Sequence, residues 1–222
     1  MSNEVGRVYI KRIYYFNLYV IKGIDGDILI DTGFILMKKK IKKWLDQFNI
    51  KLILLTHAHV DHIWNVAYIK ELYNCEVALS NLDIANIDNS IINSKPSNKR
   101  HKSFTRLMNY GMKKFVSKDF DINYLLNDND VIDKYGLNIK VVSLPGHTSG
   151  SVGFLYNNNL FCGDALVNRK RHVEIAYQNQ DNYLAKCSAL KLMEIKPDFI
   201  YVGHDRKIKY SKYEKSIFKI IS

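Results

Sequence analysis

The strongest chemical signal in this sequence is a set of three histidines and one aspartate within six positions, directly after an apolar run. The segment LLTHAHVDHIWN, residues 54–65, contains His57, His59, Asp61 and His62. Imidazole nitrogens and carboxylate oxygens are ligands that zinc and iron accept. One histidine alone is usually an ordinary surface or core residue, but four such ligands together favour a metal site. Their spacing can present two pairs of side chains toward two nearby points.

Three further candidate ligands follow strand-like segments at Gly-containing bends. They are His147 in LPGHTSG, Asp164 in FCGDA and His204 in YVGHD. Bends of this kind project a side chain from the edge of a sheet instead of packing it inside. If these strand ends gather along one rim, all seven ligands converge there, and five of the seven histidines in the chain are used.

The segments around the histidine cluster alternate between strand and helix patterns. Residues 7–31 mix β-branched and aromatic residues and predict two or three strands with a turn. Residues 34–48 have apolar positions three or four apart with lysines between them, which indicates an amphipathic helix with a solvated basic face. The apolar run 50–56 predicts a strand buried on both faces, and 63–73 predicts a helix. The cluster is therefore expected in a strand-to-helix loop.

The remainder of the chain continues the same alternation. Short strands are expected at 76–80, 138–143, 151–156, 159–162 and 198–202, and a helix across 183–195. Strands followed by helices, with hairpins between them, are typical of a layered α/β domain in which helices cover mixed sheets.

Residues 88–126 do not fit this alternation. The window contains eight Lys or Arg and three Asp, so a large part of the formal net charge of +11 lies in it. We interpret it as a basic, helical insertion within a single domain that spans residues 1–222. The remaining lysines are interpreted as a solvated surface.

Composition narrows the class of protein. A chain of 222 residues with 47% hydrophobic and 25% charged residues is expected to form one globular core. No apolar run is long enough to span a membrane and the N-terminal segment lacks a secretory apolar region, so a cytoplasmic protein is expected. Cys75, Cys162 and Cys187 are widely spaced and predicted to be reduced thiols.

Five sequence motifs, in order, resemble those of the metallo-β-lactamase superfamily. They are DTG at 31–33, THAHVDH at 56–62, PGHTSGSVGF at 145–154, GD at 163–164 and GHD at 203–205. The last motif replaces the commoner GHG of the family, which is expected to affect a loop more than a ligand. The resemblance implies a four-layer αβ/βα sandwich of two mixed sheets flanked by helices, with metals at one edge.

The resemblance also implies a ligand assignment. His57, His59 and His147 would bind the first metal, Asp61, His62 and His204 the second, and Asp164 would bridge both. Asp31 is kept outside the ligand list, as a residue that could orient the histidine loop.

Such a site predicts a dinuclear metal-dependent hydrolase. Two divalent ions, zinc in the first place with iron and manganese as alternatives, would share a hydroxide that attacks an electrophilic centre, and Asp61 could hold its proton. A bridging aspartate is similar to the glyoxalase II type and favours a small ester, thioester or lactone substrate. The sequence does not identify the substrate-binding residues or the oligomeric state.

Two features bear on the choice of substrate. The segment NRKRH at 168–172 follows Asp164 closely and could face an anionic substrate, whereas His101 and His172 are interpreted as surface residues. The alternatives are a phosphodiesterase or nuclease on the same site and a mononuclear iron persulfide dioxygenase. No aromatic and basic interleaving of the kind that stacks single strands is evident, so nucleic acid is the less favoured partner.

Overall fold

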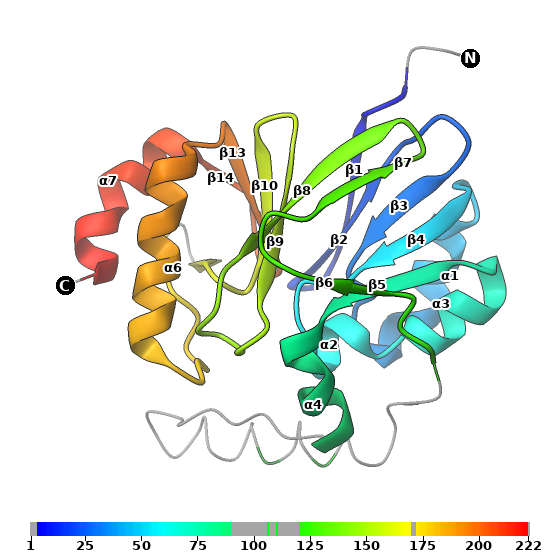
Figure 1. The fold of residues 1–222 in the computed structure, drawn as a ribbon, viewed down its shortest axis with the longest axis horizontal. Helices are drawn as coiled ribbons and strands as arrows, with labels where there is room; N and C mark the ends of the chain where they lie inside the picture. The colour runs from blue at the N-terminus through cyan, green and yellow to red at the C-terminus, as the bar shows by residue number, and fades with distance from the viewer. Residues whose placement is uncertain (1–3, 90–105, 107–109, 111–119, 170–171, 222) are drawn as a thin grey trace.

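Two β-sheets lie between two groups of helices in the computed structural model, which describes residues 4–89, 106, 110, 120–169 and 172–221 (Figure 1). The first sheet has the strand order β1-β2-β3-β4-β5-β6. The bounds of these strands are Val8–Ile13, Phe16–Ile21, Asp27–Ile30, Ile50–Leu54, Glu76–Ser80 and Tyr124–Leu126. Strands β1, β2 and β3 pair antiparallel, and β3 to β6 pair parallel, so the sheet is mixed.

The second sheet has the strand order β14-β13-β10-β9-β8-β7. In that order the bounds are Ile208–Lys209, Phe199–Val202, Asn159–Gly163, Val152–Tyr156, Leu137–Ser143 and Val131–Lys134. The β10–β13 pair is parallel and the other pairs are antiparallel. A separate hairpin consists of β11 (Val167–Arg169) and β12 (His172–Glu174).

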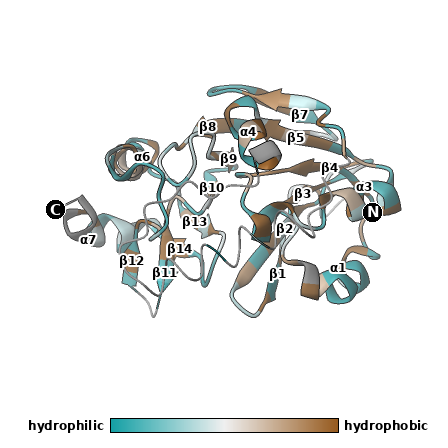
Figure 2. Cartoon of the chain, turned by 90° about the horizontal axis from the view of Figure 1, so that it is seen from below, coloured by the Kyte–Doolittle hydropathy of each residue, from teal (hydrophilic) through white to brown (hydrophobic). Residues whose placement is uncertain are grey.

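Helices cover the outer face of each sheet, which gives four layers (Figures 1 and 2). On the first sheet lie the 3-10 helix η1 and the helices α1, α2 and α3, and α4 follows β5. Their bounds are Ile35–Met37, Lys38–Leu45, Val60–Ile63, Val66–Tyr73 and Asn81–Asn89. On the second sheet lie α6 (Asn182–Ile195) and α7 (Tyr210–Ile221). The predicted four-layer α/β sandwich with two mixed sheets is confirmed.

Strand β2 illustrates why the central strands are apolar along their whole length. Leu18 and Val20 belong to the core between the first sheet and its helices. Tyr19 and Ile21 belong to the core between the two sheets. All four side chains are buried, because neither face of this strand meets solvent.

Two predicted helices are interrupted. The segment 34–48 forms η1 and then α1, and the segment 63–73 is divided between the end of α2 and the whole of α3. The second break lies at Trp64 and Asn65, where the Asn65 side chain donates hydrogen bonds to the carbonyls of Thr32 and Gly33, each at 2.9 Å. These bonds fix the start of α3 to the loop after β3.

The basic window lies mostly outside the described residues. Its last three residues, Tyr124–Leu126, form the edge strand β6 beside β5, whereas 90–105, 107–109 and 111–119 are not described. The helical insertion and the single-domain organisation therefore stay predictions. Among the described residues, no helix has the length and apolar character needed to cross a bilayer.

Candidate metal centre

All seven predicted ligands meet at one edge of the two sheets, although they come from four separate parts of the chain. The β4–α2 loop carries His57 and His59, and the short helix α2 carries Asp61 and His62. The loop after β8, the end of β10 and the end of β13 carry His147, Asp164 and His204. Strand ends thus bring together side chains that are up to about 150 positions apart in the sequence.

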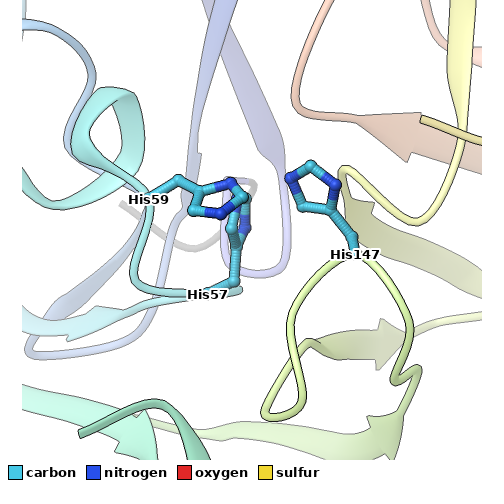
Figure 3. Close-up of side chains that lie close together, drawn as sticks. All are labelled: His57, His59 and His147. Atoms are coloured by element: carbon cyan, nitrogen blue, oxygen red, sulfur yellow. The ribbon is translucent and has the colours of Figure 1, made fainter. Parts of the chain in front are cut away.

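The ligands form two groups. His57, His59 and His147 offer three ring nitrogens that lie within 4.8 Å of one another. The rings of His57 and His59 face that of His147 across a small gap (Figure 3), with centroids 4.8 and 4.4 Å from it. The second group is Asp61, His62, Asp164 and His204, whose ligand atoms also lie within 4.8 Å of one another.

Asp164 lies between the two groups. Its Oδ2 atom is 3.7 Å from His147 Nε2 in the first group and 2.9 Å from His204 Nε2 in the second. Its Oδ1 atom is 3.6 Å from His62 Nε2. One carboxylate is therefore within reach of histidines from both groups.

Asp31 fixes the position of the histidine loop through hydrogen bonds. Its carboxylate accepts hydrogen bonds from the Thr56 backbone N–H at 2.9 Å and from His62 Nδ1 at 2.8 Å. It also accepts from the Thr56 hydroxyl, so the Thr56 oxygen can in turn accept from His57 Nδ1, 3.0 Å away. Both histidines are thereby held with Nδ1 as the donor, so Nε2 is the nitrogen that remains for a cation. The suggested orienting role of Asp31 agrees with these contacts.

Burial and neighbouring charges shift the pKa values of the candidate ligands in different directions. Burial, followed by nearby histidines, holds the pKa of His57 well below its usual range and lowers that of His59 to about 3. Burial opposes ionisation of Asp61, but His62 and His204 outweigh it and lower the pKa of Asp61 to about 2. Burial lowers the pKa of His62, but Asp31, Asp61 and Asp164 outweigh it and raise that pKa to about 9. The first group therefore holds neutral imidazoles that are ready to bind a cation, whereas a cation in the second group must displace a proton.

Unsatisfied polar atoms indicate that the site is built for cations. Within the described part of the chain, five buried ligand atoms lack a hydrogen-bond partner: His57 Nε2, His59 Nε2, His62 Nε2, His147 Nε2 and Asp164 Oδ1. Leaving a buried polar atom unpaired costs about 1–3 kcal/mol, so several at one place call for an explanation. A divalent cation in each group would satisfy all of them, and the nitrogen and oxygen donors suit zinc, iron or manganese.

Gly203 keeps the second group open. A Cβ atom at this position would lie 2.2 Å from Asp164 Oδ1 and 2.8 Å from His62 Cε1. We expect Gly203→Ala to displace Asp164 and to lower metal affinity by about 10–100-fold, the range for changes that disturb ligand orientation. Titration of the metal-free variant with zinc checks this, and affinity equal to that of the wild type would contradict it.

Asp83 was not identified from the sequence, but it joins the two histidine loops. It lies in the first turn of α4 and is fully buried. One oxygen accepts from Ala58 N at 2.7 Å, between His57 and His59, and from Thr148 Oγ1 at 2.9 Å, beside His147. The other oxygen accepts from Gly150 N at 2.9 Å. In the sequence Asp83 is a single acidic residue shortly after the predicted strand at 76–80, and nothing there distinguishes it from other acidic residues.

Replacing Asp83 should loosen both loops together. In Asp83→Asn one carboxylate oxygen becomes a donor that faces N–H and O–H groups, so we expect a loss of about 2–4 kcal/mol in the free energy of unfolding and about 10–100-fold weaker zinc binding. Denaturant unfolding and zinc titration measure these effects.

Asp27→Asn is the matched control. Asp27 is also buried and accepts from the backbone N–H groups of Gly23 and Asn49, but at the opposite end of β3 from the site. It should lower stability to a similar degree without weakening zinc binding. Equal zinc binding by Asp83→Asn and the wild type would contradict the positioning role of Asp83.

A cavity of about 680 Å³ opens in front of the two groups. His59, Asp61, His147, Asp164 and His204 form its floor. Most of its wall is aromatic or apolar and was not identified from the sequence: Tyr14, Tyr15, Phe16, Phe34, Leu36 and Met37. They come from the β1–β2 turn, the start of β2, the loop after β3 and η1, and no sequence pattern indicates that these segments meet at one cavity.

Arg169 also lines the cavity, as the interpretation of the segment 168–172 anticipated. Its guanidinium carbon lies 5.7 Å from the centre of the Tyr177 ring. His172 is exposed and outside the ligand groups, whereas His101, Lys170 and Arg171 lie outside the described residues. One cation of the basic segment therefore borders the cavity.

The fold and this site define an α/β sandwich with a candidate divalent-metal centre at the edge of its sheets. A sequence profile of the metallo-beta-lactamase superfamily matches residues 16–204. The chain belongs to this superfamily.

The individual relatives have low sequence identity to this chain. A probable metallo-hydrolase of Methanocaldococcus jannaschii is 30% identical over 158 residues, which cover 69% of this chain and 68% of the relative. A hydroxyacylglutathione hydrolase of Shewanella halifaxensis is 26% identical over 67% of this chain, and the match spans only 42% of that relative. The protein TTHA1623, solved in a di-iron-bound form, superposes with a TM-score of 0.70 at 21% identity, covering 94% of this chain and 96% of that chain. At this identity, the structural similarity to TTHA1623 supports the fold alone.

Proposed function

We propose that the protein is a dinuclear metal-dependent hydrolase that cleaves an ester, thioester or lactone bond of a small, anionic substrate. The observation that carries the proposal is the position of Asp164 between two ligand groups, at the floor of a cavity large enough for a small molecule. In this proposal His57, His59 and His147 hold one ion, Asp61, His62 and His204 hold the other, and Asp164 bridges them.

Two bound divalent ions would lower the pKa of a shared water from about 15.7 toward 7 and so make it a nucleophile at neutral pH. The residues of the chain orient and protect this chemistry. Ionised Asp61 borders the cavity and can accept a hydrogen bond from the attacking water. Because the ligand histidines are buried, bulk water is excluded from the side of the site that faces away from the cavity.

The wall of the cavity selects the substrate. Tyr15, Phe34 and Leu36 offer apolar contact to the part of the substrate next to the reacting bond. Arg169 at the same cavity offers a charge-assisted hydrogen bond to a carboxylate or phosphate. This combination suits an acyl group joined to an anionic carrier, and the hydroxyacylglutathione hydrolase relative supports a thioester among the candidates.

We propose zinc as the metal, and the di-iron form of TTHA1623 keeps iron as the first alternative. A panel of thioester, lactone, phosphodiester and β-lactam substrates, assayed with zinc-, iron- and manganese-loaded protein, tests the function. Hydrolysis of a thioester or lactone at the highest kcat/KM would support the proposal. Preference for a phosphodiester, or oxygen consumption with a persulfide by an iron-loaded form, would replace it.

A further inference from the structure

A second cavity lies directly beside the first. It has a volume of about 530 Å³ and lies between strand β1 and helix α1, which Figure 2 shows next to each other. Its lining residues are Lys11, Arg12, Ile13, Tyr14, Lys40, Lys43, Trp44 and Gln47. Tyr14 lines both cavities, so the groove and the cavity of the candidate metal centre adjoin at this side chain.

The groove is strongly positive. Four of its lining residues are Lys or Arg, and none is Asp or Glu. Arg12 is balanced by Asp205, 2.9 Å away, which lies next to the candidate ligand His204. Lys11 and Lys43 form no ion pair with any residue that the structure describes. Several uncompensated cations facing one cavity attract a group with more than one negative charge.

Aromatic residues accompany these cations. Tyr14 is exposed, and the Lys40 ammonium lies 5.1 Å from the centre of its ring. Trp44 provides a second aromatic group in the groove. Cations next to aromatic surfaces suit phosphate groups together with a heteroaromatic base, because the base can stack while the phosphates pair with ammonium groups. The lysine run of α1, interpreted from the sequence only as a solvated face, thus contributes to a cavity.

We propose that this groove binds the phosphates and base of a nucleotide-type carrier whose acyl end lies in the first cavity. The substrate would then be a thioester of a nucleotide-bearing thiol, hydrolysed to a carboxylic acid and the free thiol. Water supplies the hydroxyl of the acid and the proton of the thiol, and the acid then releases its proton to solvent. The hydrolytic part of this statement rests on the proposed function. The binding part does not.

Binding is tested with ADP as the probe, titrated calorimetrically into the protein as purified, with adenosine as the uncharged comparison. The test variant combines Lys11→Gln, Lys40→Gln and Lys43→Gln. The control variant loses the same charge at exposed sites outside the groove, by Lys39→Gln, Lys209→Gln and Lys215→Gln. We expect ADP to bind the wild type and the control equally and the test variant about tenfold more weakly, because three charge contacts are lost.

Kinetics then connects the groove to the reaction. With an acyl-coenzyme A substrate, we expect the test variant to have a KM about tenfold higher than the wild type and an unchanged kcat. With the N-acetylcysteamine thioester of the same acyl group, which lacks the nucleotide, we expect both constants of the test variant to equal those of the wild type. ADP binding without hydrolysis of either thioester would overturn the thioester substrate and keep the groove, whereas failure on the whole ester, thioester and lactone panel would overturn the proposed function. Equal ADP affinity for the test variant and the wild type, or binding only of oligonucleotides with affinity that rises with length, would overturn the groove proposal.

Discussion

Replacing His59 by alanine is expected to lower kcat/KM for the best substrate by about 1,000-fold or more. His59 is buried, its ring centroid lies 4.4 Å from that of His147, and its Nε2 atom has no hydrogen-bond partner among the described residues. Without it only two imidazoles of that group remain, and the metal loses a strong ligand. The stabilisation that a bound cation gives to the transition state is several kcal/mol, and about 4 kcal/mol corresponds to three powers of ten.

The control for this experiment is His172→Ala. His172 is an exposed histidine in β12 and lies outside both ligand groups, so its loss should leave kcat/KM within about twofold of the wild type. The metal content of both variants is measured in parallel. Full activity of His59→Ala would show that the histidine cluster is not the catalytic site.

The second large effect is expected for Asp164→Asn. The substitution keeps the shape of the side chain but removes the negative charge that lies within reach of both groups. A neutral amide is a weak ligand for zinc, so affinity should fall at both positions together and kcat/KM by at least about 1,000-fold. Zinc titration of the metal-free variant, compared with the wild type, measures the number of ions bound.

Asp133→Asn provides the comparison, since Asp133 is an exposed carboxylate on β7. It should bind zinc and hydrolyse substrate like the wild type. A variant Asp164→Asn that lost only one ion and retained the other at full affinity would contradict a bridging aspartate. The two ligand groups would then act independently.

Much of the fold could be predicted because both faces of the central strands are buried. The run 50–56 reads as a strand from its apolar residues alone, and β4 occupies Ile50–Leu54. Strands such as β11 and β14, of three and two residues, were missed. Segments this short carry no period of their own, and only their partners in the sheet define them.

The candidate ligands could be recognised because metal chemistry restricts residue type as well as spacing. Asp83 and the aromatic wall of the cavity could not, because their roles arise from contacts between distant segments. Asp83 in α4 reaches Thr148, 65 positions later, and nothing near either residue marks that contact. Tyr14 belongs to a two-residue turn between β1 and β2, a position that by itself indicates only a hairpin.

The departure from the common family motif at position 205 also has a local reason. Asp205 adopts a left-handed backbone conformation with φ of 67°, which glycine adopts most easily and Asp tolerates better than most residues. Its carboxylate pairs with Arg12 on β1 instead of entering the ligand groups. As expected from the sequence, the substitution changes a loop contact, and His204 keeps its place beside Asp164.

Elemental analysis of protein purified without added metal tests the central claim most directly. The seven side chains at the sheet edge form two groups, with Asp164 between them. They predict two divalent ions per chain, zinc in the first place, and removal of the ions by a chelator should abolish hydrolysis. A single ion per chain, or a fully active protein free of metal, would contradict the account.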